Sequence, residues 1–163
     1  MLALPVEKRV ELCLPFLTKA GLDAAPGKVA AIISAAGDRI KVAGDILDYA
    51  DFFLSDNELA FDEKAFAKEL GRAGAAELLR KLATQLAGQE TFDAASLEAL
   101  VQRFVAAEAT KVGQIIHALR IAVTGKPVGF GLYDTLAILG KSSCLARIDR
   151  ALRIASERSR QCR

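Results

Sequence analysis

Cysteine and histidine are scarce in this chain of 163 residues, and tryptophan is missing. The three cysteines, Cys13, Cys144 and Cys162, stand far apart without a C-x-x-C pair, and His117 is the single histidine. A zinc site or a disulfide framework needs several such residues at regular spacing, so the composition argues against both. Cys13 and Cys144 lie in helical apolar patterns, which predicts small core residues, whereas Cys162 lies in a polar tail.

Long apolar runs are missing as well. No uninterrupted apolar stretch reaches the length of a membrane-spanning helix, which is about 18 residues. The amino terminus also lacks the basic-then-apolar pattern of a signal peptide. A cytoplasmic location without a membrane partner is therefore the default expectation. The length and a composition of 52% apolar and 26% charged residues fit one compact domain or two small helical subdomains.

The net charge is only +2, but its distribution along the chain is uneven. Residues 1–109 carry 12 Lys and Arg against 17 Asp and Glu, whereas residues 110–163 carry 10 against 3. The carboxy-terminal third is therefore a basic module. Such a module is typical of a surface for a polyanion, because each neutralised phosphate releases counterions. A basic face that is simply solvated is the alternative.

Helical spacing of apolar residues dominates the sequence, and no strand-like alternation rises above it. The stretch LSDNELAF, residues 54–61, is polar and turn-rich, which predicts a subdomain boundary. We therefore predict an all-α fold of two consecutive helical bundles, the first over residues 1–57 and the second over residues 58–158. Residues 159–163 are expected to form a frayed tail.

Residues 111–141 form the most informative stretch, which reads as two helices joined by a glycine-rich turn. Gly125 can supply the positive backbone angle that ends the first helix, and Pro127 prevents its continuation. Gly129 and Gly131 give a loop whose backbone can approach a partner closely. From periodicity alone, a helical hairpin in a protein core is the alternative interpretation.

Several elements of this stretch follow one another in a fixed order: Arg120, Thr124-Gly125, Gly131-Leu132-Tyr133 and Leu139-Gly140-Lys141. In this order and spacing they resemble the carboxy-terminal, anticodon-binding part of bacterial-type glutamyl-tRNA synthetases. An earlier stretch is similar to the same family, because Arg39 follows a helix there and the aromatic pair Phe52-Phe53 closes a short helix. The resemblance covers nearly all of residues 4–155 and implies the helical anticodon-binding domains of a class I synthetase.

The resemblance implies recognition of the anticodon arm of tRNA(Glu), with tRNA(Gln) as a second candidate. Arg39 and Arg120 would read bases at the two ends of the anticodon, a task that suits the fixed donors of a planar guanidinium. Gly129, Phe130 and Leu132 would surround the middle base, and the Phe130 ring would be placed to stack on a base. Some family members carry other residue types at Gly129 and Phe130.

Three further candidates rest on charge and polarity rather than on the resemblance. Lys111, Gln114 and Lys126 lie at the start of the first helix and in the loop, and we expect them to contact phosphate or sugar groups. For Arg39, an ion pair with a neighbouring aspartate at the helix margin is the alternative role.

Catalytic signatures are not found in this sequence. Class I synthetases carry an H-I-G-H-like and a K-M-S-K-S-like motif, and neither occurs here; Lys141-Ser142-Ser143 reads as a helix start. The glycines of the loop follow a helix rather than a strand, and no G-K-[ST] completes a Walker motif. We therefore expect no catalytic residue, metal or cofactor in this chain. ATP and Mg²⁺ would belong to a catalytic domain that precedes it in cis, so the chain alone should be inactive.

Two other functions are compatible with the residues. A stand-alone helical protein-interaction module would present a groove to a partner helix, and its binding would not depend on an anticodon sequence. A small helical enzyme would need His117 as its acid or base, although no nucleophile with an acidic orienting group is suggested nearby.

Overall fold

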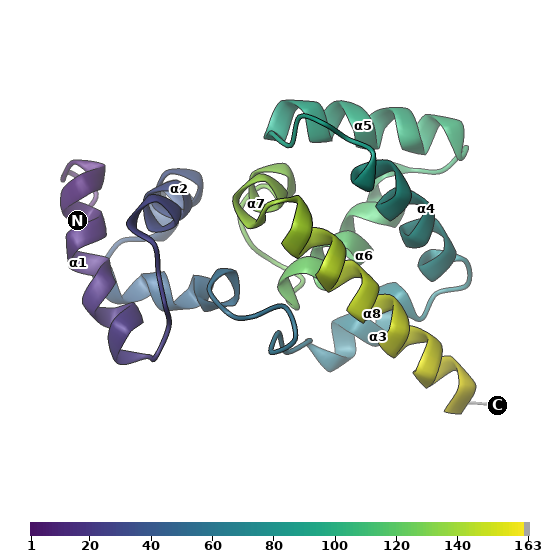
Figure 1. Cartoon of the computed structure of the whole chain (residues 1–163), viewed down its shortest axis with the longest axis horizontal. Coiled ribbons are helices and arrows are strands. Elements are labelled where there is room, and N and C mark those ends of the chain that lie inside the picture. Colours follow the sequence, from purple (N-terminus) through teal and green to yellow (C-terminus); the bar gives the residue numbers. More distant parts are fainter. Residues whose placement is uncertain (162–163) are drawn as a thin grey trace. The chain divides into compact units, whose positions relative to one another are not determined.

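The computed structural model describes residues 1–161, which form helices and turns and contain no strand. The all-α prediction is confirmed. The chain divides into two compact units, Met1–Ser55 (unit 1) and Asp56–Arg163 (unit 2) (Figure 1). The predicted boundary at residues 57 and 58 lies two residues farther along the chain than this division. Among the described residues, no helix is both long and apolar enough to cross a membrane.

Unit 1 contains two α-helices and two 3₁₀ segments: α1 (Val6–Lys19), α2 (Pro26–Ala36), η1 (Gly37–Arg39) and η2 (Ala43–Phe52). The helix α1 packs against both α2 and η2, and the apolar side chains between them are fully buried, among them Cys13, Leu17, Ile32, Ile33 and Ile46. Where the sequence suggested a short amphipathic helix before Phe52, the chain is 3₁₀-helical, with a break at Tyr49 (φ −110°, ψ 22°).

Unit 2 is built from the remaining helices: α3 (Glu63–Leu70), α4 (Ala75–Ala87), α5 (Ala94–Ala107), α6 (Val112–Thr124), α7 (Leu132–Leu139) and α8 (Lys141–Gln161). Two of them begin with an aspartate cap. The Asp62 carboxylate accepts the Ala65 N–H at 2.9 Å, and the Asp93 carboxylate accepts the Ser96 N–H at 2.8 Å. Each cap satisfies a backbone donor that the first helical turn leaves unpaired.

The helix α6 is the centre of unit 2, because it contacts all five other helices of that unit. Its buried stripe is wide, and six of its apolar side chains have no exposed surface: Ile115, Ala118, Leu119, Ile121, Ala122 and Val123. Such a helix is held on most of its circumference, so the loop that follows it starts from a fixed point.

The final helix departs from the sequence prediction in two respects. It continues through Gln161, so residues 159–161 are helical, and residues 162 and 163 of the predicted frayed tail lie outside the described residues. Basic side chains in the last turn, Arg158 and Arg160, favour this extension because they complement the helix dipole. Helical periodicity in the sequence predicts that the arginines of this last helix point mostly outward. This prediction is wrong for Arg147, which is 1% exposed.

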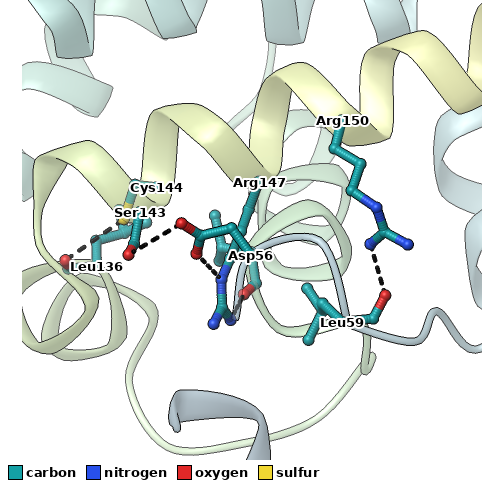
Figure 2. A network of polar contacts seen from close by, with 8 residues as sticks. Asp56, Leu59, Leu136, Ser143, Cys144, Arg147 and Arg150 are labelled. Atoms are coloured by element: carbon teal, nitrogen blue, oxygen red, sulfur yellow. Dashed lines mark hydrogen bonds and ion pairs between the residues drawn. The ribbon is translucent and has the colours of Figure 1, made fainter. Parts of the chain in front are cut away.

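We call the first residues of unit 2, residues 56–62, the strap. Arg147 is buried between the strap and α6, where its guanidinium donates hydrogen bonds to both. Its Nε donates to the Asp56 carboxylate at 2.8 Å, and its Nη1 donates to the Val123 carbonyl at 2.8 Å. One turn farther along α8, Arg150 donates to the Leu59 carbonyl at 2.6 Å. Figure 2 shows both arginines directed from α8 toward the strap. The strap thus lies along the body of unit 2.

Candidate nucleic-acid interface

The loop between α6 and α7 begins at Gly125, which ends α6 in the left-handed conformation (φ +76°), as the sequence predicted. The Gly125 carbonyl accepts the Asp62 N–H at 2.7 Å, so the strap and the loop are joined here. A β-carbon on Gly125 would lie 2.0 Å from the Ala60 carbonyl oxygen. Glycine is therefore required by backbone angle and by space.

Arg120, in the last turn of α6, is half-buried and reaches the far end of the loop. Its Nη1 donates to the Phe130 carbonyl at 2.9 Å. A β-carbon on Gly129 would lie 3.1 Å from the same nitrogen, so glycine lets the guanidinium lie close to the loop backbone. Arg120, Gly129 and Phe130, predicted separately as site residues, are brought together by this contact.

Two hydroxyl groups fix the ends of the loop. The Thr124 hydroxyl donates to the Arg120 carbonyl at 2.8 Å and accepts the Lys126 N–H at 3.2 Å. The Thr135 hydroxyl in α7 donates to the Gly131 carbonyl at 3.0 Å. The loop is therefore held at both ends by side chains of the helices that flank it.

The aromatic and aliphatic side chains of the loop are placed differently from what the sequence suggested. Phe130 is 2% exposed and Leu132 is 4% exposed, so both side chains belong to the core of unit 2. Stacking of the Phe130 ring on a base is thus not a contact that this surface offers, because the ring is buried. Only backbone groups of these two residues remain as candidates for RNA contact.

Val128 is the loop residue that sequence reasoning missed. It is 75% exposed, which makes it the most exposed of the large hydrophobic residues in the described chain. Its neighbours Pro127 and Gly129 are exposed as well. The signal was present in the sequence, because an apolar residue between proline and glycine has no helical face on which to be buried.

Lys111 and Gln114 lie at the opposite end of α6 from the loop. Gln114 has a capping role, since its Oε1 accepts from the Thr110 hydroxyl and from the Lys111 N–H. From Gln114 to Arg120 the helix rises about 9 Å and turns through about 240°. The structure therefore separates these two candidates from the loop, whereas Lys126 lies within it.

Arg39 is an exposed side chain of unit 1, in the turn that follows α2. Neither Asp38 nor Asp45 forms an ion pair with it in the described chain. The Asp45 carboxylate instead accepts the N–H groups of Lys41 at 2.8 Å and Val42 at 3.0 Å, and these bonds lower the pKa of Asp45. Asp45, one of the two aspartates considered as a partner for Arg39, thus caps the backbone of the following turn, and the role of Arg39 stays a prediction.

The turn that carries Arg39 is contacted by a buried arginine of α1. Arg9 in α1 is 8% exposed, and its Nη2 lies 3.4 Å from the Ile40 carbonyl, to which it donates. Its Nε is buried and has no hydrogen-bond partner within the described part of the chain. Sequence reasoning missed Arg9, although its spacing of four residues from Cys13 places it on the buried stripe of α1.

His117 is exposed on α6 and borders a hollow of about 250 Å³ whose lining includes Lys64, Lys68 and Pro127. None of the described residues that line this hollow is a serine or a cysteine. Cys13 and Cys144 are fully buried, as predicted, and burial raises the pKa of the Cys144 thiol to about 12. Within residues 1–161, no group of three or more His, Cys, Asp or Glu could hold a metal ion.

These features fit a known class of domain. Residues 8–152 match the family model of the anticodon binding domain, and the chain belongs to this family. It is similar to the glutamate–tRNA ligase of Moorella thermoacetica, with 34% identity over 154 residues that cover 91% of this chain and 31% of the relative. The glutamate–tRNA ligase of Herpetosiphon aurantiacus is 32% identical over 152 residues, 89% of this chain and 30% of that protein.

The fold is shared with solved structures. A glutamate tRNA ligase from Elizabethkingia meningosepticum, crystallised in complex with its amino acid, has a TM-score of 0.82 at 21% identity. The match covers 92% of this chain and 29% of that chain. The resemblance to the anticodon-binding part of glutamyl-tRNA synthetases is thus confirmed, and this chain spans less than a third of the length of these relatives.

Proposed function

We propose that this chain recognises the anticodon of tRNA(Glu) as part of a glutamate–tRNA ligase. The full-length enzyme would attach glutamate to tRNA with ATP and Mg²⁺, which a catalytic domain in cis would bind. The observation that carries the proposal is the Arg120 guanidinium held 2.9 Å from the Phe130 carbonyl, beside an exposed loop, in a chain of the anticodon binding domain family.

The chemistry of this loop suits unstacked bases. A guanidinium beside a glycine-rich backbone offers fixed donors to a base edge, and exposed Val128 offers an apolar contact to a base face. Lys126 supplies a positive charge in the same loop for a phosphate. Arg39 offers a second exposed guanidinium in unit 1. We place base recognition at Arg39, Arg120 and the 126–130 backbone.

Lys111 and Gln114 have a different place in this proposal. They are about 9 Å or more from Arg120 along α6, so we assign them contacts to the phosphates of the anticodon stem rather than to the bases. Contacts of this kind strengthen binding without selecting a sequence.

The test is equilibrium binding of the chain to a tRNA(Glu) transcript, to the same transcript with a changed anticodon, and to a tRNA(Gln) transcript, each at two salt concentrations. We expect the original anticodon to bind about tenfold more tightly than the changed one, a difference equivalent to roughly 1.4 kcal/mol. Arg120→Ala and Arg39→Ala should reduce this preference. Arg103→Ala, which removes an exposed arginine of α5, should leave it unchanged.

Equal, salt-sensitive binding of all three transcripts would mean that the site is a basic surface that does not distinguish anticodon bases. Absence of binding at low salt would refute RNA recognition by this chain. It would favour the alternative of a helical protein-interaction module. The measurement with the tRNA(Gln) transcript decides whether recognition extends beyond tRNA(Glu).

A further inference from the structure

A hollow on the surface of unit 2 adjoins the α6–α7 loop, and we call it the α3–α6 hollow. Its volume is about 250 Å³, and its apolar lining comes from Ala65 of α3, Ile121 of α6 and Pro127 of the loop. Binding sites for drug-sized ligands usually occupy about 300–1,000 Å³. The α3–α6 hollow therefore has the size for a single flat ring rather than for a whole small molecule.

The walls of this hollow are fixed by hydrogen bonds. The Asp62 N–H donates to the Gly125 carbonyl at 2.7 Å, which joins the cap of α3 to the cap of α6. The Asp62 carboxylate accepts the Ala65 N–H at 2.9 Å, and the helices α3 and α6 also pack against each other. The hollow is thus preformed, which limits the free energy that ordering would cost when a ligand binds.

His117 contributes an exposed ring to one side of the hollow. It lies four residues before Ile121 and three before Arg120, and such spacings on a helix bring β-carbons to about 5–6 Å. Unstacked RNA bases bind on flat side chains, histidine among them. A base that leaves the stack beside the one read by Arg120 would therefore meet the His117 ring.

The charged groups around the hollow favour a phosphate. Its two carboxylates are already occupied, because Asp62 caps α3 and Glu69, whose side chain is 12% exposed, pairs with Arg72 at 3.1 Å. Lys64 and Lys68, one turn apart on α3, are both exposed. Their ammonium groups are therefore the charges that the rim of the hollow offers to an RNA backbone.

We propose that the α3–α6 hollow binds an unstacked RNA base that directly flanks the anticodon, stacked on His117, with the adjoining phosphates at Lys64 and Lys68. This inference rests on the proposed function and deepens it, because it adds a nucleotide outside the anticodon to the RNA that the loop binds. The contact strengthens binding whatever the anticodon sequence is.

The test is a thermodynamic cycle between the full chain and a synthetic tRNA(Glu). One change is His117→Ala, and the other is an abasic nucleotide immediately before or immediately after the anticodon. Each change alone should weaken binding about tenfold at one of the two flanking positions, equivalent to roughly 1.4 kcal/mol and within the range for one stacked base. Both changes together should also weaken binding about tenfold, because they remove the same contact.

A second variant at this position separates stacking from a structural role. His117→Phe keeps a flat ring and should bind the unmodified tRNA(Glu) about as tightly as the wild type does. The free energy of unfolding should stay the same in His117→Ala, because the side chain is exposed.

Lys64→Gln with Lys68→Gln tests the phosphate contacts. At about 0.7 per phosphate of a single strand, the slope of log affinity against log salt should become shallower by about 1.4 in this double variant. The matched control is Arg103→Gln with Arg153→Gln, which removes the same charge from exposed positions of α5 and α8. The control should leave the slope unchanged, and an unchanged slope in the lysine variant would overturn the phosphate contacts.

An affinity that His117→Ala leaves unchanged, or losses that multiply to about a hundredfold at both flanking positions, would overturn base binding in the hollow. This holds even where the chain prefers the original anticodon. Equal affinity for the original and the changed anticodon would instead count against the proposed function. The cycle would then still show whether a flanking base binds at His117, so the two failures are distinguishable.

Discussion

Replacement of Gly125 by alanine provides a quantitative test of how the strap and the α6–α7 loop meet. Alanine at φ +76° is in a conformation that costs an L-residue about 1–2 kcal/mol. The added β-carbon would also lie 2.0 Å from the Ala60 carbonyl oxygen, which is backbone and cannot rotate away. The strap must therefore shift in this variant.

The shift has a calculable consequence, because two hydrogen bonds hold the strap at this point. They are the Asp62 N–H to the Gly125 carbonyl at 2.7 Å and Arg150 to the Leu59 carbonyl at 2.6 Å. A neutral bond contributes about 0.5–1.5 kcal/mol and one to a charged group about 1.5–3 kcal/mol. Together with the backbone strain, we expect Gly125→Ala to lower the free energy of unfolding of unit 2 by about 3–6 kcal/mol.

Gly74→Ala is the matched control for this experiment. Gly74 also has a positive φ, +81°, but a β-carbon there would meet no atom within 4 Å. It should therefore cost only the strain of about 1–2 kcal/mol.

The assay is urea unfolding followed by tyrosine fluorescence. The chain has two tyrosines and no tryptophan, so a Tyr49→Phe background leaves Tyr133 as a reporter of unit 2 alone. Equal losses in the Gly125→Ala and Gly74→Ala variants would refute the claim that the strap passes against Gly125.

Three further predictions concern the site and the core. Gly129→Ala should displace the Arg120 guanidinium, because the added β-carbon would lie 3.1 Å from its Nη1. The preference for the original anticodon should fall in the binding assay, while the melting temperature stays unchanged. An unchanged preference would contradict the link between Gly129 and the position of Arg120. Asp62→Ala removes the cap of α3 and should lower the unfolding free energy of unit 2 by about 1 kcal/mol, measured in urea, with no change counting against the cap. The stability of unit 2 should fall as pH rises from about 9 to 11, because the unfolded Cys144 thiol ionises near its usual pKa of 9.0 whereas burial raises the folded pKa to about 12. Urea midpoints should show this fall to be shallower in Cys144→Ala, and identical slopes would exclude Cys144 as its cause.

The helices and their ends follow from local sequence. Apolar spacing of three and four marks the buried faces, aspartate precedes α3 and α5, and Gly125 ends α6 in the conformation expected of it. The order of elements from Arg120 to Lys141 also carried the resemblance to the anticodon-binding region. These features are readable because each depends on residues within a few positions of one another.

Burial of single side chains within the loop depended on tertiary packing. The sequence marked Phe130 and Val128 as two apolar residues of one glycine-rich loop, yet one is 2% exposed and the other 75% exposed. No periodicity exists outside a helix to tell the two apart. Which of them faces solvent is decided by tertiary packing, which the local sequence does not show.

What the sequence alone determined is the all-α class, the helices and the family to which the loop belongs, because these depend on local patterns. Only the tertiary structure decided that Arg147 is buried against Asp56, a residue 91 positions earlier, and that Arg150 binds the Leu59 carbonyl, also 91 positions earlier. Local periodicity placed Arg147 among outward arginines, because a charged residue on α8 shows no partner in its own helix. Its partner exists only once the strap has folded back onto α6 and α8.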